Sequence, residues 1–328
     1  MKKIVVGWTI VISLLSFHGR AYTYQRGVEV SSEHSSADSL LTEADKIFQS
    51  RDYQAALDGY AEALQLARDE FNRSIEVEAL AQMARMKLLL GMKEEGRDYL
   101  EEAASRAIDT DPMGWSRYLG VKGRFQWKDN DLESARKTFD DLYTFCHLNS
   151  LWGRAIDAAN MLAIVSASVD EQIEWSKRGI EAAQTAGEES WLGPLWNNLA
   201  ATYYDEKRFD SALECYLKAR EYHWRFSDEP GKLLADYHVG MTYRALGDIQ
   251  NAIKWLRPVL AWAERMENAS VIGQTSEDLG EIAIAVGNES EGIELLKTAR
   301  ENYLAAGFDQ SWPEVWENIN KRLQQLGQ

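Results

Sequence analysis

Cysteine and histidine are scarce in this sequence, and their scarcity excludes several classes of chemistry. The 328 residues contain two cysteines and five histidines. Neither the spacing of Cys146 and Cys215 nor the isolated histidines provide metal ligands at the intervals that zinc sites use. No glycine-rich phosphate loop follows a strand, because no strand pattern is present. We therefore expect no catalytic residues, no cofactor and no bound metal, and we expect that the protein is not an enzyme.

Long hydrophobic runs are absent after the first seventeen residues. Lys2-Lys3 precede the apolar run Ile4–Phe17, and Gly19-Arg20-Ala21 then provides a small-x-small cleavage signal. This three-part layout is typical of a secretory signal peptide, which we place at residues 1–21. Residues 22–36 are polar and aperiodic, so we expect a flexible leader there. The mature protein is expected in the periplasm or outside the cell, without membrane insertion, and the alternative is tethering by an uncleaved N-terminal anchor.

Basic residues are fewer than acidic ones, with 36 Lys and Arg against 52 Asp and Glu. The net charge is −16, and removal of residues 1–21, with Lys2, Lys3 and Arg20 and no acidic residue, changes it to −19. Such an acidic surface repels nucleic acid and anionic lipid heads, and it favours basic partners. We therefore expect no nucleic-acid partner.

What the sequence does contain is a small residue that returns about every forty positions. A second small residue follows twelve positions later in every copy but the fourth, in which the interval is nine and the position holds Gln172. Self-similarity of this period indicates stacked supersecondary units, not one globular core. The first marker stands at Ala44, Ala84, Gly123, Ala163, Ala200, Gly240 and Gly280.

The fifth copy shows most clearly what each unit is. Apolar residues recur at intervals of three and four on either side of the short polar segment 205–208, which indicates a helical hairpin of two helices, A and B. The recurring residues of this copy are Trp196, Leu199, Ala200, Tyr203, Phe209, Ala212, Tyr216 and Ala219. This pattern resembles the tetratricopeptide repeat, with longer units of about 40 residues, as in kinesin light chains and bacterial peptide-pheromone receptors.

The predicted fold is all-α, a right-handed α-solenoid of about seven helical hairpins over residues 37–310. Residues 311–328 follow as a C-terminal capping helix, starting with a capping box of Ser311 and Glu314 and carrying an apolar stripe. Pro258 falls inside the second helix of the sixth unit, where we expect a kink or break. Cys146 and Cys215 lie in second helices with a whole unit between them, so we expect two free, buried thiols.

The resemblance implies a concave groove lined by the A helices, and a first set of candidate groove residues is basic. It surrounds the second and third markers, and its arginines offer a fork of donors suited to carboxylates. An acidic peptide segment or a terminal carboxylate would fit there. The alternative is that these cations pair with acids on adjacent helices, such as Glu78 and Asp157. The set is Arg85, Arg117, Arg124, Trp127 and Lys128.

A second set of candidate groove residues is polar and aromatic. Asn160 and Asn197 occupy the same repeat position, and an asparagine side chain can bind both N–H and C=O of an extended peptide backbone. The alternative is local capping or inter-helix bonding by the asparagines. We expect Trp175, Trp196 and Trp255 in the core. The set is completed by Tyr204, Tyr237 and Arg244.

These residues predict a non-enzymatic exported scaffold that binds a protein or peptide in the groove. The alternative is a sensory module that binds an oligopeptide or small ligand and signals to a membrane partner. The sequence identifies neither the partner nor the oligomeric state.

Overall fold

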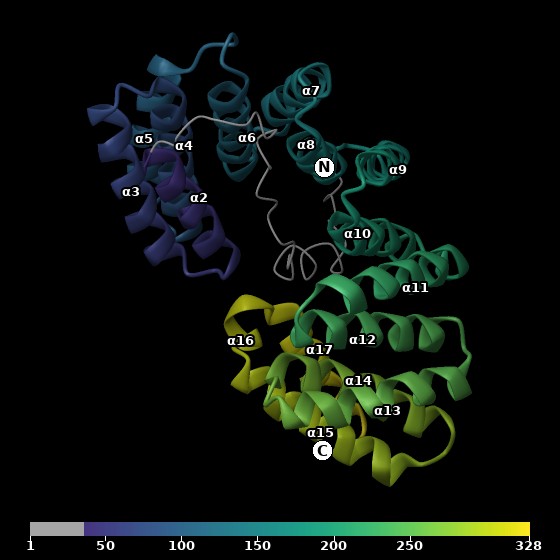
Figure 1. Ribbon diagram of the computed structural model, residues 1–328. Coiled ribbons are helices and arrows are strands. Elements are labelled where there is room, and N and C mark those ends of the chain that lie inside the picture. Colours follow the sequence, from purple (N-terminus) through teal and green to yellow (C-terminus); the bar gives the residue numbers. More distant parts are fainter. Residues whose placement is uncertain (1–35) are drawn as a thin grey trace. The chain divides into compact units, whose positions relative to one another are not determined.

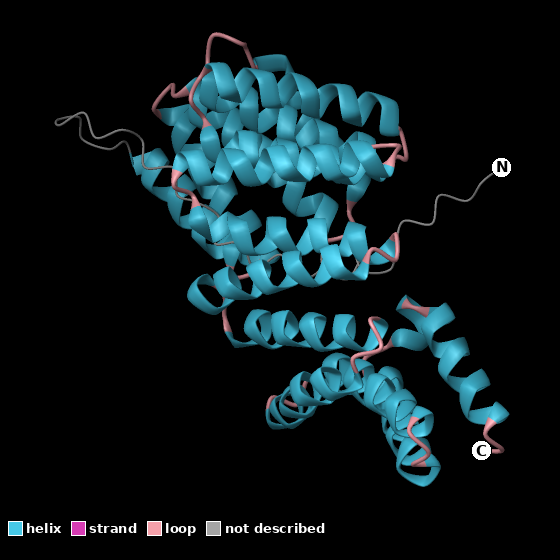
Figure 2. Ribbon diagram, turned by 90° about the vertical axis from the view of Figure 1, so that its right-hand side faces the viewer, coloured by secondary structure: helices cyan, strands magenta, loops and turns pink. Residues whose placement is uncertain are grey.

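The computed structural model describes residues 36–328, and all regular secondary structure in this range is helical (Figures 1 and 2). The predicted signal peptide, and the leader up to residue 35, lie outside the described residues. Within the described residues no helix is both long and apolar enough to cross a membrane. The predicted all-α class is confirmed.

Fourteen of the helices follow one another as the seven A and B pairs that the repeat predicts. Helix A packs against helix B in the pairs α2–α3, α4–α5, α6–α7, α8–α9, α12–α13 and α14–α15. The α14–α15 hairpin is the seventh, and α16 and α17 follow it. The bounds are α2 (Ser36–Gln49) and α3 (Tyr53–Asp69), α4 (Arg73–Leu89) and α5 (Lys93–Arg106), α6 (Pro112–Lys128) and α7 (Leu132–Leu148), α8 (Trp152–Val165) and α9 (Val169–Ala186), α10 (Leu192–Asp205) and α11 (Phe209–Phe226), α12 (Glu229–Ala245) and α13 (Ile249–Arg265), α14 (Ala269–Ala285) and α15 (Glu289–Ala305), then α16 (Phe308–Ser311) and α17 (Pro313–Gln325), with a 3₁₀ turn, η1 (Glu189–Trp191), before α10.

The chain divides between Leu195 and Trp196 into two compact units. The N-terminal unit, residues 36–195, contains α2 to α9, and its core includes Tyr60, Phe125 and Phe139. The C-terminal unit, residues 196–328, contains most of α10 and all of α11 to α17, and its core includes Leu256 and Tyr303.

Polar residues before the helices explain where many of them begin. Asp52, for example, accepts a hydrogen bond from the backbone N–H of Ala55 at 3.0 Å and thereby satisfies one of the free donors of the first turn. The connections are short, and Gly287, at φ 89°, ends α14 in the left-handed region that favours glycine. The same capping bond is made by Asn72, Asp111, Asp131, Ser168, Asp228, Asp248 and Asn268.

The small marker residues lie where helices A and B approach most closely. Ala44, Ala84 and Ala200 are fully or almost fully buried. A Cβ atom on Gly123 would lie 2.6 Å from the ring of Phe139, and one on Gly240 would lie 2.7 Å from Leu256. Both distances are too short for carbon atoms, so the periodic small residue is a packing requirement of the hairpin.

Two local predictions are corrected by the structure. The break allowed for at Pro258 is absent, because α13 is one continuous helix and the buried residues Leu256 and Val259 on either side of the proline hold it against the core. Ser311 does not cap α17. It is the last residue of α16, and its hydroxyl donates to the carbonyl of Gly307, while α17 begins at Pro313.

Other sequence expectations about the interior are confirmed. Cys146 and Cys215 are free and buried. On α17 the predicted apolar stripe faces the core, where Ile319 and Leu323 are buried and Val315 and Trp316 are partly buried.

Candidate functional site

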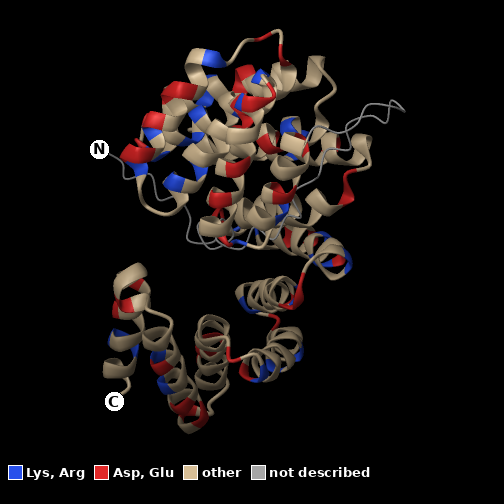
Figure 3. Cartoon of the chain, turned by 60° about the vertical axis from the view of Figure 1, so that its left-hand side comes forward, with Lys and Arg blue, Asp and Glu red and all other residues tan. Residues whose placement is uncertain are grey.

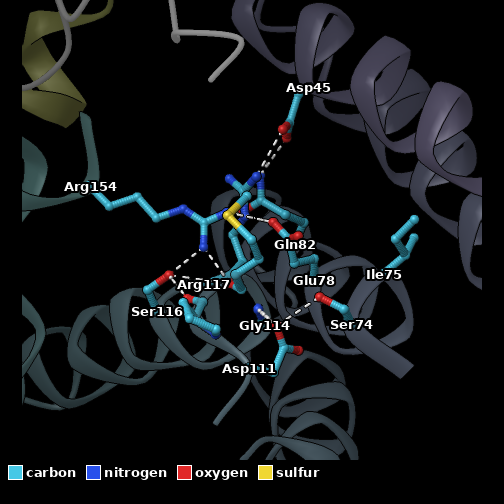
Figure 4. Close-up of polar contacts among 12 residues, drawn as sticks. Asp45, Ser74, Ile75, Glu78, Gln82, Asp111, Gly114, Ser116, Arg117 and Arg154 are labelled. Atoms are coloured by element: carbon cyan, nitrogen blue, oxygen red, sulfur yellow. Dashed lines mark hydrogen bonds and ion pairs between the residues drawn. The ribbon is translucent and has the colours of Figure 1, made fainter. Parts of the chain in front are cut away.

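The A helices of the N-terminal unit carry a network of partly buried charges around the buried Glu78 (Figure 4). Arg117 on α6 pairs with Asp45 on α2, with Nη2 2.9 Å from Oδ2, and with Glu78 on α4, with Nε 3.2 Å from Oε2. Arg154 on α8 reaches the same oxygen of Glu78 and also donates to the carbonyl of Met113. One carboxylate thus connects three A helices, although seventy-six positions separate Glu78 from Arg154.

Neighbouring hydrogen bonds fix the carboxylate of Asp45 in this network. Tyr60 donates its hydroxyl to Oδ1 at 2.6 Å, and Gln82 donates its amide to the same atom at 3.0 Å. Burial alone would raise the pKa of Asp45, but the charge of Arg117 and these two hydrogen bonds outweigh it and lower the pKa. The carboxylate therefore remains charged and holds Arg117 in place.

A second ion pair lies on the same helices. Arg124 on α6 donates through Nη2 to both oxygens of Asp157 on α8, at 2.7 and 2.8 Å, and through Nη1 to the carbonyl of Gly120. For Arg117 and Arg124 the alternative raised by the sequence is confirmed, since both pair with acids of adjacent A helices, namely Glu78 and Asp157.

Arg85 differs from the other arginines of this face because it has no carboxylate partner among residues 36–328. Its guanidinium carbon lies 4.6 Å from the centre of the Phe48 ring, and the residue is half-buried. Burial and the nearby charge of Arg124 lower the pKa of Arg85 to about 10, although Asp157 opposes this. The arginine is thus still charged at neutral pH, in a position where positive charge is unfavourable.

The charges of the seven side chains in this cluster sum to a positive value. Four arginines, Arg85, Arg117, Arg124 and Arg154, face three carboxylates, Asp45, Glu78 and Asp157, which leaves +1 (4 − 3). The chain as a whole carries −16, and acidic residues occur along many of its helices (Figure 3). A local excess of positive charge in so acidic a chain favours an anionic ligand.

The remaining candidates of the N-terminal unit contribute less to this face. The ammonium of Lys128 lies 4.6 Å from the centre of the Trp127 ring, and Trp127 packs against the core while Lys128 is exposed. Asn160 is buried on α8. Trp175, which the sequence places in the core, is partly buried there.

In the C-terminal unit the second candidate asparagine makes an inter-helix bond. Asn197 on α10 accepts a hydrogen bond at 2.8 Å from Nδ1 of His238 on α12, and both residues are buried. Burial, followed by the charge of His223, lowers the pKa of His238 to about 3. The histidine is therefore neutral at pH 7, with its proton on Nδ1, since the amide oxygen can only accept.

The aromatic and charged candidates of the C-terminal unit meet around Asp278 of α14. The Nε atom of Arg244 lies 2.7 Å from Oδ1 of Asp278, and the nearby Tyr237 hydroxyl partly opposes the rise that burial causes in the pKa of that carboxyl group. Burial, followed by the charge of Asp278, raises the pKa of Tyr204 to about 12. Tyr204, Tyr237, Arg244 and Asp278 thus form one polar cluster on the A helices α10, α12 and α14.

The structure therefore places the predicted residues on the A helices, as expected, but in two separate units. Sequence analysis missed Asp45, Arg154 and Asp278, which complete the networks. Asp45 directly follows the first marker, at the same repeat position as Arg85 and Arg124, so this alignment was available as a signal. Among residues 36–328 no group of three histidine, cysteine or acidic side chains is arranged to hold a metal ion.

The fold and part of the sequence match known proteins. Residues 188–257 match the family model for the tetratricopeptide repeat. None of the curated proteins compared matches the chain. The family resemblance expected from the repeat pattern is confirmed.

Three solved structures show the same fold at low sequence identity. A signal transduction ATPase with a tetratricopeptide-repeat sensor, from Pyrococcus horikoshii, aligns with TM-score 0.69 and 15% identity over 88% of this chain. The chain spans 44% of that protein, less than half of its length. A Rap protein complexed with competence and sporulation factor has TM-score 0.58 and 15% identity, covering 85% of this chain and 79% of its own. BtubC from P. vanneervenii has TM-score 0.56 and 17% identity, covering 71% and 93%. The chain is a tetratricopeptide-like helical-repeat scaffold.

Proposed function

We propose that this scaffold binds a protein or peptide on its A-helix face, and that the N-terminal unit contributes a site for a carboxylate. The observation that carries the proposal is Arg85, a half-buried arginine without a carboxylate partner in the described chain, in a cluster of seven charged side chains with net charge +1. A ligand carboxylate would neutralise this excess and form charge-assisted hydrogen bonds with the guanidinium.

The surrounding ion pairs support this assignment. Arg117 and Arg124 are held by their own carboxylates, so they are not free to bind a ligand without breaking those pairs. Arg85 makes no such ion pair within the described residues. It lies close enough to both arginines for their charges to lower its pKa. The site is thus preorganised, because the arginine that would bind is fixed among side chains that already have partners.

The experiment is a peptide array probed with the full chain, using peptides that end in a free carboxylate or in an amide. Wild type, Arg85→Gln and Arg136→Gln are compared. Arg136 is the matched control, because it lies on the B helix α7, is about half exposed and pairs with Glu171. We expect Arg85→Gln to lose the carboxylate-dependent peptides and Arg136→Gln to keep them. Identical peptide sets for all three proteins would contradict the proposal.

A sensory role is the second candidate, and the coupling among the arginines favours it. An anion at Arg85 would weaken the repulsion between Arg85 and its neighbours Arg117 and Arg124, which connect α2, α4, α6 and α8. Ligand binding would thereby change the strength of contacts between repeats. Hydrogen exchange measured with and without a bound peptide tests this, since a pure scaffold would gain protection only where the peptide lies.

We further propose that the protein is exported through the signal peptide of residues 1–21. The support is the order of charge, apolar run and small-x-small site in the sequence. Expression with and without residues 1–21 in a Gram-negative host, followed by fractionation and N-terminal sequencing, tests the proposal. Cleavage near Ala21 with release to the periplasm is the expected result, whereas an intact N-terminus in the membrane fraction would indicate the anchor instead.

A further inference from the structure

The helix α14 of the C-terminal unit buries an unusual number of polar side chains. Gln274, Thr275, Ser276 and Asp278 are all buried, in a helix whose equivalents elsewhere bury mainly apolar residues. Asp278 is 5% exposed, and its Oδ2 atom has no hydrogen-bond partner among the described residues. Burying a carboxylate oxygen that accepts no hydrogen bond is unfavourable in free energy. This oxygen could be satisfied by a hydrogen-bond donor of a bound ligand.

A second carboxylate lies beside it, and one arginine faces both. Glu277, the preceding residue, is half-buried and accepts a hydrogen bond at 2.5 Å from the hydroxyl of Tyr303. Arg244 pairs with Asp278. The nearby Glu281 is already held by Arg322, which donates to its two oxygens at 2.6 and 2.9 Å. Two arginines thus face three carboxylates, so the local charge is −1 (2 − 3).

The directions in which the pKa values of Asp278 and Glu277 shift agree with a deficit of positive charge around them. Burial raises the pKa of Asp278, and the charge of Arg244 and the hydrogen bond from Tyr237 only partly oppose it. Burial likewise raises the pKa of Glu277, with a further contribution from the neighbouring Asp278. Both carboxylates would therefore be stabilised by one more cation.

The remaining side chains of the cluster fit an organic cation. Tyr204 and Tyr237 keep their protons at neutral pH, because burial raises the pKa of both, so they offer uncharged rings and hydroxyl groups. Aromatic faces beside carboxylates are the surroundings that ammonium and guanidinium groups prefer. No cluster with three metal ligands exists among residues 36–328, which argues against a metal ion as the missing charge.

We propose that Glu277 and Asp278, with Tyr204 and Tyr237, form a binding site for an ammonium or guanidinium group, supplied by a basic side chain of a peptide ligand. The proposal rests on the proposed peptide-binding function and names the ligand chemistry of the C-terminal unit. The incoming group donates to Glu277 and to Oδ2 of Asp278 and lies against the tyrosine rings. Half-buried Glu277, Arg244 and Tyr204 form the accessible part of the site.

The test measures binding of a blocked probe peptide, acetyl-Gly-Ser-Lys-Ser-Gly-amide, to the full chain by ligand-observed NMR. A matched peptide has norleucine in place of lysine, and 1,5-diaminopentane represents a free amine. We expect the lysine peptide to bind at least about tenfold more tightly than the norleucine peptide. Preference for 1,5-diaminopentane over the lysine peptide would keep the cation site but reject a peptide as its source.

Three variants connect the binding to these carboxylates. Asp278→Asn and Glu277→Gln should each weaken binding of the lysine peptide by about tenfold or more. Glu281→Gln is the matched control on the same helix, and it should weaken binding clearly less than the other two variants, because Glu281 pairs with Arg322 and makes no contact with the bound cation. Melting temperatures of all three variants show whether each remains folded, and Glu277→Gln retains the shape of the site if Asp278→Asn does not fold.

Equal binding of the lysine and norleucine peptides, or no binding of either, would overturn the cation site. Equal losses in Glu281→Gln and Asp278→Asn would also overturn it. The peptides that test Arg85 are chosen without lysine, so that the two experiments give separate outcomes. Loss of the lysine preference with retained Arg85-dependent binding would reject this site and leave the proposed function standing.

Discussion

At the scale of single residues, the most consequential feature is that charge is buried where the A helices meet. Glu78 is fully buried and is shared by Arg117 and Arg154. Buried ion pairs contribute little net stability when complete, because desolvation offsets their attraction. Removing one partner, however, leaves an uncompensated buried charge.

Glu78→Ala should therefore lower the free energy of unfolding by about 3 kcal/mol or more. Glu95→Ala is the matched control, since Glu95 pairs with Lys87 but its side chain is 62% exposed, and it should cost less than about 1 kcal/mol. Urea denaturation followed by circular dichroism measures both values. Losses of similar size would mean that the Glu78 network is no more buried in solution than an ordinary surface pair.

His238 predicts a pH dependence of stability. Its pKa in the folded protein is about 3, below the unfolded value of 6.5. Below pH 6.5 the unfolded chain therefore takes up a proton that the folded chain does not. The contribution of the neutral histidine is complete above pH 6.5 and is lost as the pH falls toward 3, at up to about 1.4 kcal/mol per pH unit.

The measurement compares urea denaturation of wild type and His238→Gln between pH 7.5 and pH 5. We expect the variant to show a shallower loss of stability on acidification, because it lacks this titrating group. The same substitution at exposed His147 is the control. Parallel curves for wild type and His238→Gln would show that His238 is protonated in the folded protein.

At the scale of helices, the hairpin depends on small residues at fixed positions. Two glycines of α6 provide a matched pair, three residues apart. A Cβ on Gly123 would meet Phe139 at 2.6 Å, whereas a Cβ on Gly120 would have its nearest neighbours at 3.6 Å. Gly123→Ala should destabilise by about 1–3 kcal/mol through overpacking.

Gly120→Ala should instead stabilise by about 0.5–1 kcal/mol, because alanine lowers the entropy cost of forming the helix. Opposite signs in thermal or urea denaturation are the expected result. Destabilisation by both alanines would mean that helix packing around α6 tolerates no added methyl group, and the repeat marker at Gly123 would then have no special role.

The same scale explains how much of the fold the sequence predicts. Helix pairs follow from the repeat because Ala44, Ala84 and their equivalents satisfy one steric condition in every hairpin. The start of α17 was mispredicted because Ser311 satisfies a short-range capping pattern, yet its hydroxyl bonds back to Gly307 within α16. The break expected at Pro258 is absent because burial of the flanking residues Leu256 and Val259 outweighs the hydrogen bond that proline cannot donate.

The sequence predicts which helices carry the candidate site residues, but it does not predict most of their side-chain partners. The repeat positions place Arg117, Arg124 and Asn197 on A helices, as the structure has them. The partners depend on how side chains from several repeats meet. Arg154 binds Glu78, which lies seventy-six positions away in the sequence, and His238 binds Asn197 forty-one positions away. A local sequence pattern cannot predict contacts between residues so far apart.

At the scale of the whole molecule, the charge distribution is the property most relevant to function. The chain carries −16, yet the arginine cluster on the A helices of the N-terminal unit carries +1, while the Asp278 cluster of the C-terminal unit carries −1. Ligands of opposite charge would thus be recognised in the two units, if both proposals hold. Net acidity elsewhere keeps the scaffold soluble and limits nonspecific contacts with other acidic molecules.

The end of the repeat array gives the last prediction. Helix α17 covers the seventh hairpin, because its buried Ile319 and Leu323 pack in one cluster with Leu296, Tyr303 and Phe308. A terminal repeat without such a helix exposes an apolar face to water. Deletion of residues 311–328 should therefore lower the melting temperature and produce oligomers larger than those of the parent, as measured by size-exclusion chromatography with light scattering.

Arg322→Gln separates the apolar cover from the ion pair that α17 also makes. The pair with Glu281 is partly exposed, so its loss should cost less than about 1 kcal/mol and leave the size distribution of the parent unchanged. If the deletion were as mild as Arg322→Gln, the seventh hairpin would need no cover, and the apolar stripe on α17 would have to be assigned to contact with another molecule. The apolar residues of α17 and of the seventh hairpin lie in one buried cluster. We therefore expect the deletion to lower the melting temperature much more than Arg322→Gln does.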